Sequence, residues 1–96
     1  MLSFSNVPEE QKHPNVVKLF EIIDNDEEDR LIIVEEFCSK GTLLNWNSKD
    51  FTFSPNNEFA QDGYLTITKV KSVLKQMASG LQFLHSLGVI HRDIKP

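Results

Sequence analysis

The chain has 96 residues, of which 40% are hydrophobic and 25% are charged, and its formal net charge at pH 7 is −4. This length suits one small domain, and the composition is ordinary for a soluble globular protein. The 14 acidic residues against 10 basic ones argue against a nucleic-acid or anionic-membrane partner, because both require a basic face.

Three further features narrow the class of protein. The longest apolar run, Leu31-Ile32-Ile33-Val34, is far shorter than the roughly 20 residues of a membrane span. No basic and then apolar leader follows Met1, so no secretion signal is expected. Cys38 is the single cysteine, which excludes an internal disulfide and fits a reducing compartment. We therefore expect an intracellular, cytoplasmic protein without a disulfide partner.

Residues 1–12 are polar, show no clear period and are left unassigned. Asn6 and Glu9 could cap a short helix, because an Asn side chain can accept free N–H groups of the first turn. A solvated, frayed terminus is the alternative. His13-Pro14-Asn15 predicts a turn, because Pro fixes φ and disfavours helix at the residue before it.

Two strands are predicted next, over residues 16–23 and 31–37, which are rich in β-branched and aromatic side chains. The connection between them, residues 24–30, is too charged to be buried, so an antiparallel pair with a solvent-facing loop is the simplest arrangement. Calcium binding is the rival interpretation of this loop, since its acidic residues follow an EF-hand-like spacing. However, Asp29 stands where that loop requires Gly, and the flanks are strand-like.

Residues 39–65 are punctuated by Ser, Asn, Asp, Gly and Pro, which predicts irregular structure. Within this stretch Leu43, Leu44 and Trp46 could form one short helical turn. Residues 47–63 are interpreted as a surface insertion.

A helix of about 20 residues is predicted from Thr66 onward, because apolar residues recur three and four positions apart on one face. These residues are Ile67, Val70, Leu74, Met77, Leu81 and Leu84. Thr66 is the predicted N-cap, and Gly88 is predicted to end the helix in a left-handed conformation. The apolar surface is broad enough that we expect packing partners on more than one side.

The last six residues, His91-Arg92-Asp93-Ile94-Lys95-Pro96, resemble the catalytic loop of eukaryotic protein kinases. The Lys two residues after the Asp is typical of the serine/threonine branch. Other landmarks follow in the order of that family. His13-Pro14-Asn15 resembles the turn that precedes the family's fourth strand. Residues 17–24 resemble that strand, and residues 31–36 resemble the fifth. Glu36-Phe37-Cys38 with Gly41 resembles the hinge, and residues 66–87 resemble helix E.

The resemblance covers residues 13–96 and implies an α+β fold that is part of a kinase domain. This part would comprise the end of the N-lobe with its strand hairpin, the hinge, a turn like the family's helix D, the long helix E and the start of the catalytic loop.

The resemblance also implies roles for four residues of the last segment. Asp93 would be the carboxylate that accepts the proton of the substrate hydroxyl, and Lys95 would reach the γ-phosphate of ATP. Arg92 would pair with a phosphorylated activation segment, and His91 would serve as a scaffold.

Three residues near the hinge receive roles in the same way. Backbone groups of Glu36 and Cys38 would hold the adenine ring. Glu35 corresponds to the gatekeeper, which is normally apolar. A carboxylate in that position is costly to bury unless it is paired.

Several parts of a working kinase are not found among these residues. The resemblance implies ATP and Mg²⁺ for a complete domain and a protein substrate, for which another kinase is one candidate. The Gly-rich loop, the β-strand Lys and the Asp-Phe-Gly metal site are missing from the 96 residues, and the position of the family's helix C Glu falls on Phe4. We therefore expect this chain alone to be inactive, with no metal ligands and no cofactor of its own.

A narrower resemblance is carried by Glu36-Phe37-Cys38-Ser39-Lys40-Gly41 and by residues 80–96. Both stretches are similar to the calmodulin-dependent kinase kinases and to the fungal upstream activators of the AMP-activated kinase family.

A non-catalytic kinase-like interaction module is the alternative function, and an unrelated α+β domain with a fortuitous motif is a third hypothesis. Because a two-stranded hairpin is marginal alone and its edges invite association, the isolated chain is predicted to be poorly soluble or molten.

Overall fold

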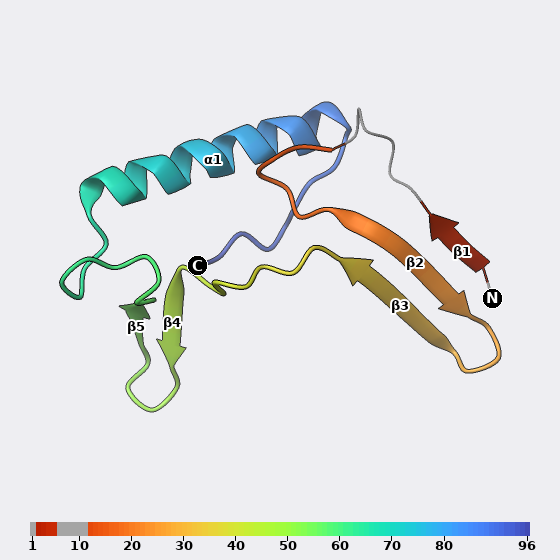
Figure 1. Ribbon diagram of the computed structural model, residues 1–96, viewed down its shortest axis with the longest axis horizontal. Coiled ribbons are helices and arrows are strands. Elements are labelled where there is room, and N and C mark those ends of the chain that lie inside the picture. Colours follow the sequence, from red (N-terminus) through yellow and green to blue (C-terminus); the bar gives the residue numbers. More distant parts are fainter. Residues whose placement is uncertain (1, 6–11) are drawn as a thin grey trace. The chain divides into compact units, whose positions relative to one another are not determined.

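The computed structural model describes residues 2–5 and 12–96. Along the chain these residues form β1 (Leu2–Ser5), β2 (Leu19–Asn25), β3 (Arg30–Glu35), β4 (Leu44–Asn47), β5 (Thr52–Pro55) and α1 (Ile67–Ser86), as Figure 1 shows. The chain divides into two compact units, Met1–Phe37 and Cys38–Pro96. We call them the first and the second unit. The predicted helix cap at Asn6 and Glu9 lies outside the described residues.

The first unit is built on an antiparallel sheet in the order β1-β2-β3. The predicted hairpin is confirmed as β2 and β3, but β2 begins later than expected. The reason is the preceding turn, in which the Val16 N–H donates to the His13 carbonyl oxygen at 3.2 Å and delays the start of the strand. Between the strands, the Asn25 side-chain oxygen accepts from the Glu27 N–H at 3.2 Å. Asp29 adopts a positive φ of 50°, a conformation that Asp tolerates.

The acidic connection between β2 and β3 is exposed, as predicted from its charge. Within the described part of the chain, no three His, Cys, Asp or Glu side chains are grouped so that they could hold a metal ion.

Strand β1 was missed by the sequence analysis. Leu2–Ser5 pairs antiparallel with β2, from Leu2 opposite Asp24 to Ser5 opposite Glu21. The interpretation of residues 1–12 as lacking any period is therefore wrong for these four residues. Their apolar and polar types do alternate, which is the strand period, but four residues are too few for the pattern to stand out.

The described residues of the first unit form no buried core. None of the apolar side chains that the structure describes is buried. Along β3, Leu31, Ile32, Ile33 and Val34 are all exposed, although they alternate between the two faces of the sheet. A sheet normally buries at least one face against another layer, but the exposed side chains of β3 show that this strand buries neither of its faces.

The second unit begins with a β-hairpin where a helical turn was expected. Leu43, Leu44 and Trp46 do not form that turn, and the prediction is wrong. Leu44–Asn47 pairs with Thr52–Pro55 in antiparallel register. The local reason is the turn: the Asn47 side-chain oxygen accepts from the Lys49 N–H at 2.9 Å, and its amide donates to the Asp50 carboxylate at 3.0 Å.

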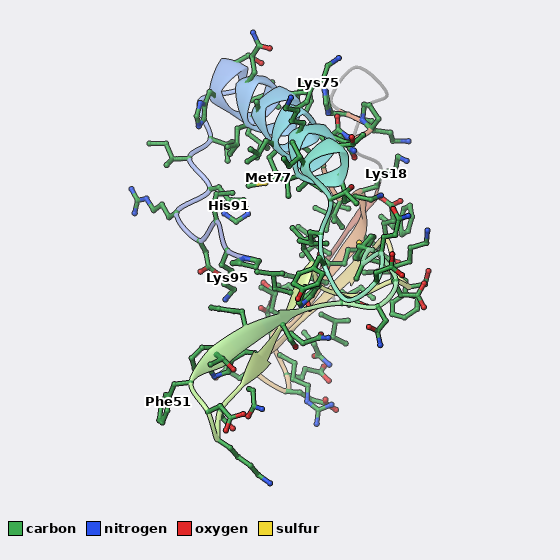
Figure 2. The ribbon with its side chains drawn as sticks, turned by 90° about the vertical axis from the view of Figure 1, so that its left-hand side faces the viewer. Lys18, Phe51, Lys75, Met77, His91 and Lys95 are labelled. Carbon is green, nitrogen blue, oxygen red and sulfur yellow. The ribbon has the colours of Figure 1, made fainter. Side chains whose placement is uncertain are left out.

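The β4–β5 hairpin is amphipathic. Its register places Leu44 opposite Pro55 and Trp46 opposite Phe53, and these four residues share one face because side chains alternate along a strand. The rings of Trp46 and Phe53 lie 4.9 Å apart between centroids, and Phe51 meets Trp46 edge-on at 6.2 Å. Figure 2 shows Phe51 at the tip of the hairpin. Such cross-strand aromatic pairs stabilise a ribbon that has few other contacts.

Helix α1 confirms the predicted helix with both of its caps. The Thr66 hydroxyl accepts from the Lys69 N–H at 3.1 Å. At the other end Gly88 has a φ of 75°, its N–H donates to the His85 carbonyl, and the Val89 N–H donates to the Leu84 carbonyl at 2.9 Å. This pair of bonds is a Schellman motif.

The apolar face of α1 is largely uncovered. Ile67 is 75% and Leu74 57% exposed, and of the helix residues only Gly80 is buried. The predicted partners of this face do not come from β4 or β5, with which the helix shares no close backbone approach. No helix within the described residues is both long and apolar enough to cross a membrane.

Candidate active site

The segment after α1 carries the predicted catalytic residues, and it is held at both of its ends. At its start the Schellman motif turns the chain out of the helix through the Val89–Leu84 bond. At its end the Pro96 carbonyl oxygen accepts from the Leu43 N–H at 3.1 Å, next to the base of the β4–β5 hairpin. Figure 2 shows His91 and Lys95 on this segment, between α1 and the hairpin. Residues 89–96 are called the catalytic segment below, after the catalytic residues that the sequence predicts there.

The turn within the catalytic segment is centred on Arg92. The Asp93 N–H donates to Nδ1 of His91 at 3.0 Å, and Arg92 between them has a φ of 67°. Left-handed backbone costs an L-residue about 1–2 kcal/mol, so the imidazole bond offsets part of that cost. The His91 side chain thus fixes the backbone of Asp93.

Asp93 and Lys95 form an ion pair in which Nζ lies 3.2 Å from Oδ2. Their side chains are 70% and 73% exposed. Exposed pairs of this kind contribute little to stability, about 0–1 kcal/mol. The arrangement brings a carboxylate that can accept a proton beside an ammonium that can contact an anion. The Arg92 side chain is exposed as well.

The predicted hinge residues lie on either side of the boundary between the two units. In the first unit, Glu36 is tied to Lys18 twice: its N–H donates to the Lys18 carbonyl at 2.8 Å, and its carboxylate accepts from the Lys18 N–H at 3.2 Å. In the second unit, the Cys38 carbonyl accepts from the Gly41 N–H at 3.1 Å, where Gly41 has a φ of 73°. The Cys38 thiol is free and exposed. Part of the predicted adenine-binding backbone is thus engaged in local bonds.

Glu35, at the predicted gatekeeper position, ends β3 opposite Leu19. Its side chain is exposed. A solvated carboxylate does not incur the desolvation cost that the sequence analysis associated with burial at this position.

Asn56 is a structurally important residue that the sequence analysis missed. It follows β5 directly, and its side chain bonds to the backbone of three other residues of the second unit. The available signal was its place after Pro55, since Asn often bonds to nearby backbone groups in turns. That signal does not reveal partners earlier in the chain.

Comparisons with known proteins identify the family. The protein kinase domain family matches residues 5–96. The serine/threonine-protein kinase TOS3 of Saccharomyces cerevisiae is 36% identical over 88 residues, which is 88% of this chain and 14% of that protein. SNF1-activating kinase 1 of the same species is 33% identical over 84 residues, covering 88% of this chain and 7% of that protein.

A third relative comes from an animal. The calcium/calmodulin-dependent protein kinase kinase of Caenorhabditis elegans is 36% identical over 84 residues, or 88% of this chain and 13% of that protein. No solved structure matches the chain. The chain spans between 7% and 14% of the length of these three relatives. The family predicted from the His-Arg-Asp segment and its flanking landmarks is thus confirmed, and the chain belongs to the protein kinase domain family.

Proposed function

We propose that this chain is part of a protein serine/threonine kinase, which transfers the γ-phosphate of ATP to a Ser or Thr hydroxyl of a protein substrate. The observation that carries the proposal is the pair of Asp93 and Lys95, 3.2 Å apart on a segment held at both ends, within the region that matches the kinase family. The names of the relatives, a serine/threonine-protein kinase and a protein kinase kinase among them, support the same reaction.

In this proposal Asp93 orients the substrate hydroxyl and accepts its proton. The hydroxyl oxygen forms a bond to the γ-phosphorus while the bond from that phosphorus to the bridging oxygen of ADP breaks, and ADP leaves with the electron pair. Lys95 turns from Asp93 to the γ-phosphate oxygens. The turn is inexpensive because the exposed ion pair is weak. Mg²⁺, when bound in a complete domain, neutralises charge on the phosphate oxygens.

The remaining site residues are assigned supporting roles. His91 holds the Asp93 backbone, which its 3.0 Å hydrogen bond supports. Arg92 is proposed to pair with a phosphorylated activation segment, which its exposed guanidinium would permit. Backbone groups of Glu36 and Cys38 are proposed to contact adenine, with Glu35 at the back of that site.

The proposal also assigns the helices and strands of this chain to elements of the kinase domain. Strands β2 and β3 correspond to the family's fourth and fifth strands, and α1 to its helix E. The kinase portion is proposed to be residues 13–96, with residues 1–12 outside the pattern, although the family match itself begins at residue 5.

The substrate is proposed to be another protein kinase. One relative is named as a kinase of kinases, the calcium/calmodulin-dependent protein kinase kinase, and another is named as SNF1-activating kinase 1. The 96-residue chain alone is proposed to be inactive, because its sequence holds neither a Gly-rich loop nor an Asp-Phe-Gly metal site.

The test is replacement of Asp93 in a complete kinase domain that contains this segment. We expect Asp93→Asn to lower turnover of a Ser/Thr peptide by about 10²–10⁴, the usual contribution of a general base. Asp26→Asn, which changes the same group in the exposed loop between β2 and β3, is the matched control and should leave turnover unchanged. Equal turnover of the Asp93→Asn and wild-type domains would refute the assignment.

A further inference from the structure

Asn56 uses both ends of its side chain at the base of the β4–β5 hairpin. Its Nδ2 donates to the Lys40 carbonyl at 2.8 Å and to the Thr42 carbonyl at 2.7 Å. Its Oδ1 accepts from the Glu58 N–H at 3.0 Å. An Asn amide offers two donors and an acceptor in this geometry, whereas an Asp carboxylate offers no donor. The residue type is therefore matched to the two carbonyl oxygens that it faces.

The backbone around Asn56 extends this bonding to the catalytic segment. The Asn56 N–H donates to the Leu43 carbonyl at 3.0 Å, and the Leu43 N–H donates to the Pro96 carbonyl at 3.1 Å. Residue 43 is thus bonded on one side to Asn56 and on the other to the residue that follows Lys95. The side chain of Asn56 also bonds to the carbonyl oxygens of residues 40 and 42, which directly precede residue 43 in the chain.

We propose that Asn56 is a positioning residue for the catalytic segment. It fixes the backbone from Lys40 to Leu43. This backbone in turn holds the Pro96 end of the catalytic segment at a set distance from the C-terminal end of α1. This inference rests on the proposed function, because the segment that Asn56 positions is the proposed catalytic one. Asn56 contacts neither substrate nor ATP in this role and acts through Leu43.

The rival role for Asn56 is simple packing at the hairpin base. The two roles differ in which substitution, Asn56→Asp or Asn56→Ala, they predict to be more harmful. Asp has nearly the shape of Asn, so a packing role makes Asn56→Ala more harmful than Asn56→Asp. In the positioning role the new carboxylate oxygen would face the Lys40 and Thr42 carbonyl oxygens. Asn56→Asp should then be at least as harmful as Asn56→Ala.

The first experiment measures amide hydrogen exchange in a complete kinase domain that contains this chain. We expect the Leu43 amide to exchange about tenfold faster in Asn56→Asp, because a lost hydrogen bond is worth about that factor. The acceleration in Asn56→Ala should be equal or smaller. The Val89 amide, bonded at the far end of the catalytic segment, should stay within about twofold of wild type. Asn57→Asp, the same change at the exposed neighbouring residue, is the control and should leave Leu43 unchanged.

Three results would overturn the proposal: a Leu43 amide that is already unprotected in the wild-type domain, one that Asn56→Asp leaves unchanged, and one that Asn57→Asp accelerates equally. A second experiment follows peptide turnover per active site in a complete domain. Asn56→Asp should lower it about tenfold, and unchanged turnover would refute the positioning role. A wild-type domain without any activity would instead refute the proposed function, and the exchange result would still decide whether Asn56 fixes Leu43.

Discussion

Replacement of Gly88 by Ala tests how the C-terminal end of α1 directs the chain into the catalytic segment. Gly88 has a φ of 75°, and a Cβ added there would meet no atom within 4 Å. The cost of Ala is therefore that of left-handed backbone alone, about 1–2 kcal/mol. That free energy corresponds to a factor of roughly 5–30 in the population of the Schellman turn. Asn, which tolerates this conformation, should fall between Gly and Ala.

The assay is the set of ¹³Cα secondary chemical shifts at residues 84–87, which report helix at the end of α1. We expect these shifts to fall in the order Gly, Asn, Ala at position 88. Gly63→Ala is the matched control, since Gly63 also has a positive φ of 81° and open space around its Cα, but lies in a turn before the helix. The reasoning is refuted if Gly88→Ala keeps wild-type shifts, or if Gly63→Ala reduces them equally.

Two further predictions concern the hairpin and the chain as a whole. Phe53→Ala should destabilise the β4–β5 hairpin by about 0.5–1.5 kcal/mol, because it removes the ring whose centroid lies 4.9 Å from that of Trp46. Amide exchange along β4 and β5 measures this loss, and Phe37→Ala, which replaces an exposed ring, is the neutral control. Equal exchange in the two variants would contradict the estimate. The isolated 96-residue chain should melt without a sharp cooperative transition, since no apolar side chain among its described residues is buried; a steep calorimetric transition in dilute buffer would show that a core forms after all.

The sequence predicted those elements whose signals are local. Helix α1 carries its apolar period, its Thr66 cap and its Gly88 terminator within the helix or directly beside it, so pattern and structure agree. The β2–β3 pair was predicted for the same reason, since two apolar runs flank a charged turn. The family was recognisable because the His-Arg-Asp segment stands at the right place after the helix.

The elements that were missed depend on weaker or distant signals. Strand β1 exists through its pairing with β2, and its own four residues carry little pattern. In β4 the alternation of Leu44, Asn45, Trp46 and Asn47 was present, but the many turn-forming residues nearby outweighed it. Asn56 bonds to carbonyls 14 and 16 residues earlier in the chain, and no local spacing specifies such partners.

The ring pair in the β4–β5 hairpin also gives the chain a built-in optical reporter. Trp46 is the single tryptophan, and its ring contacts those of Phe51 and Phe53 in the same ribbon. Its emission therefore samples that ribbon alone, whereas the helical band in far-UV circular dichroism samples α1. Following both signals during denaturation would separate the melting of the ribbon from that of the helix without any added label.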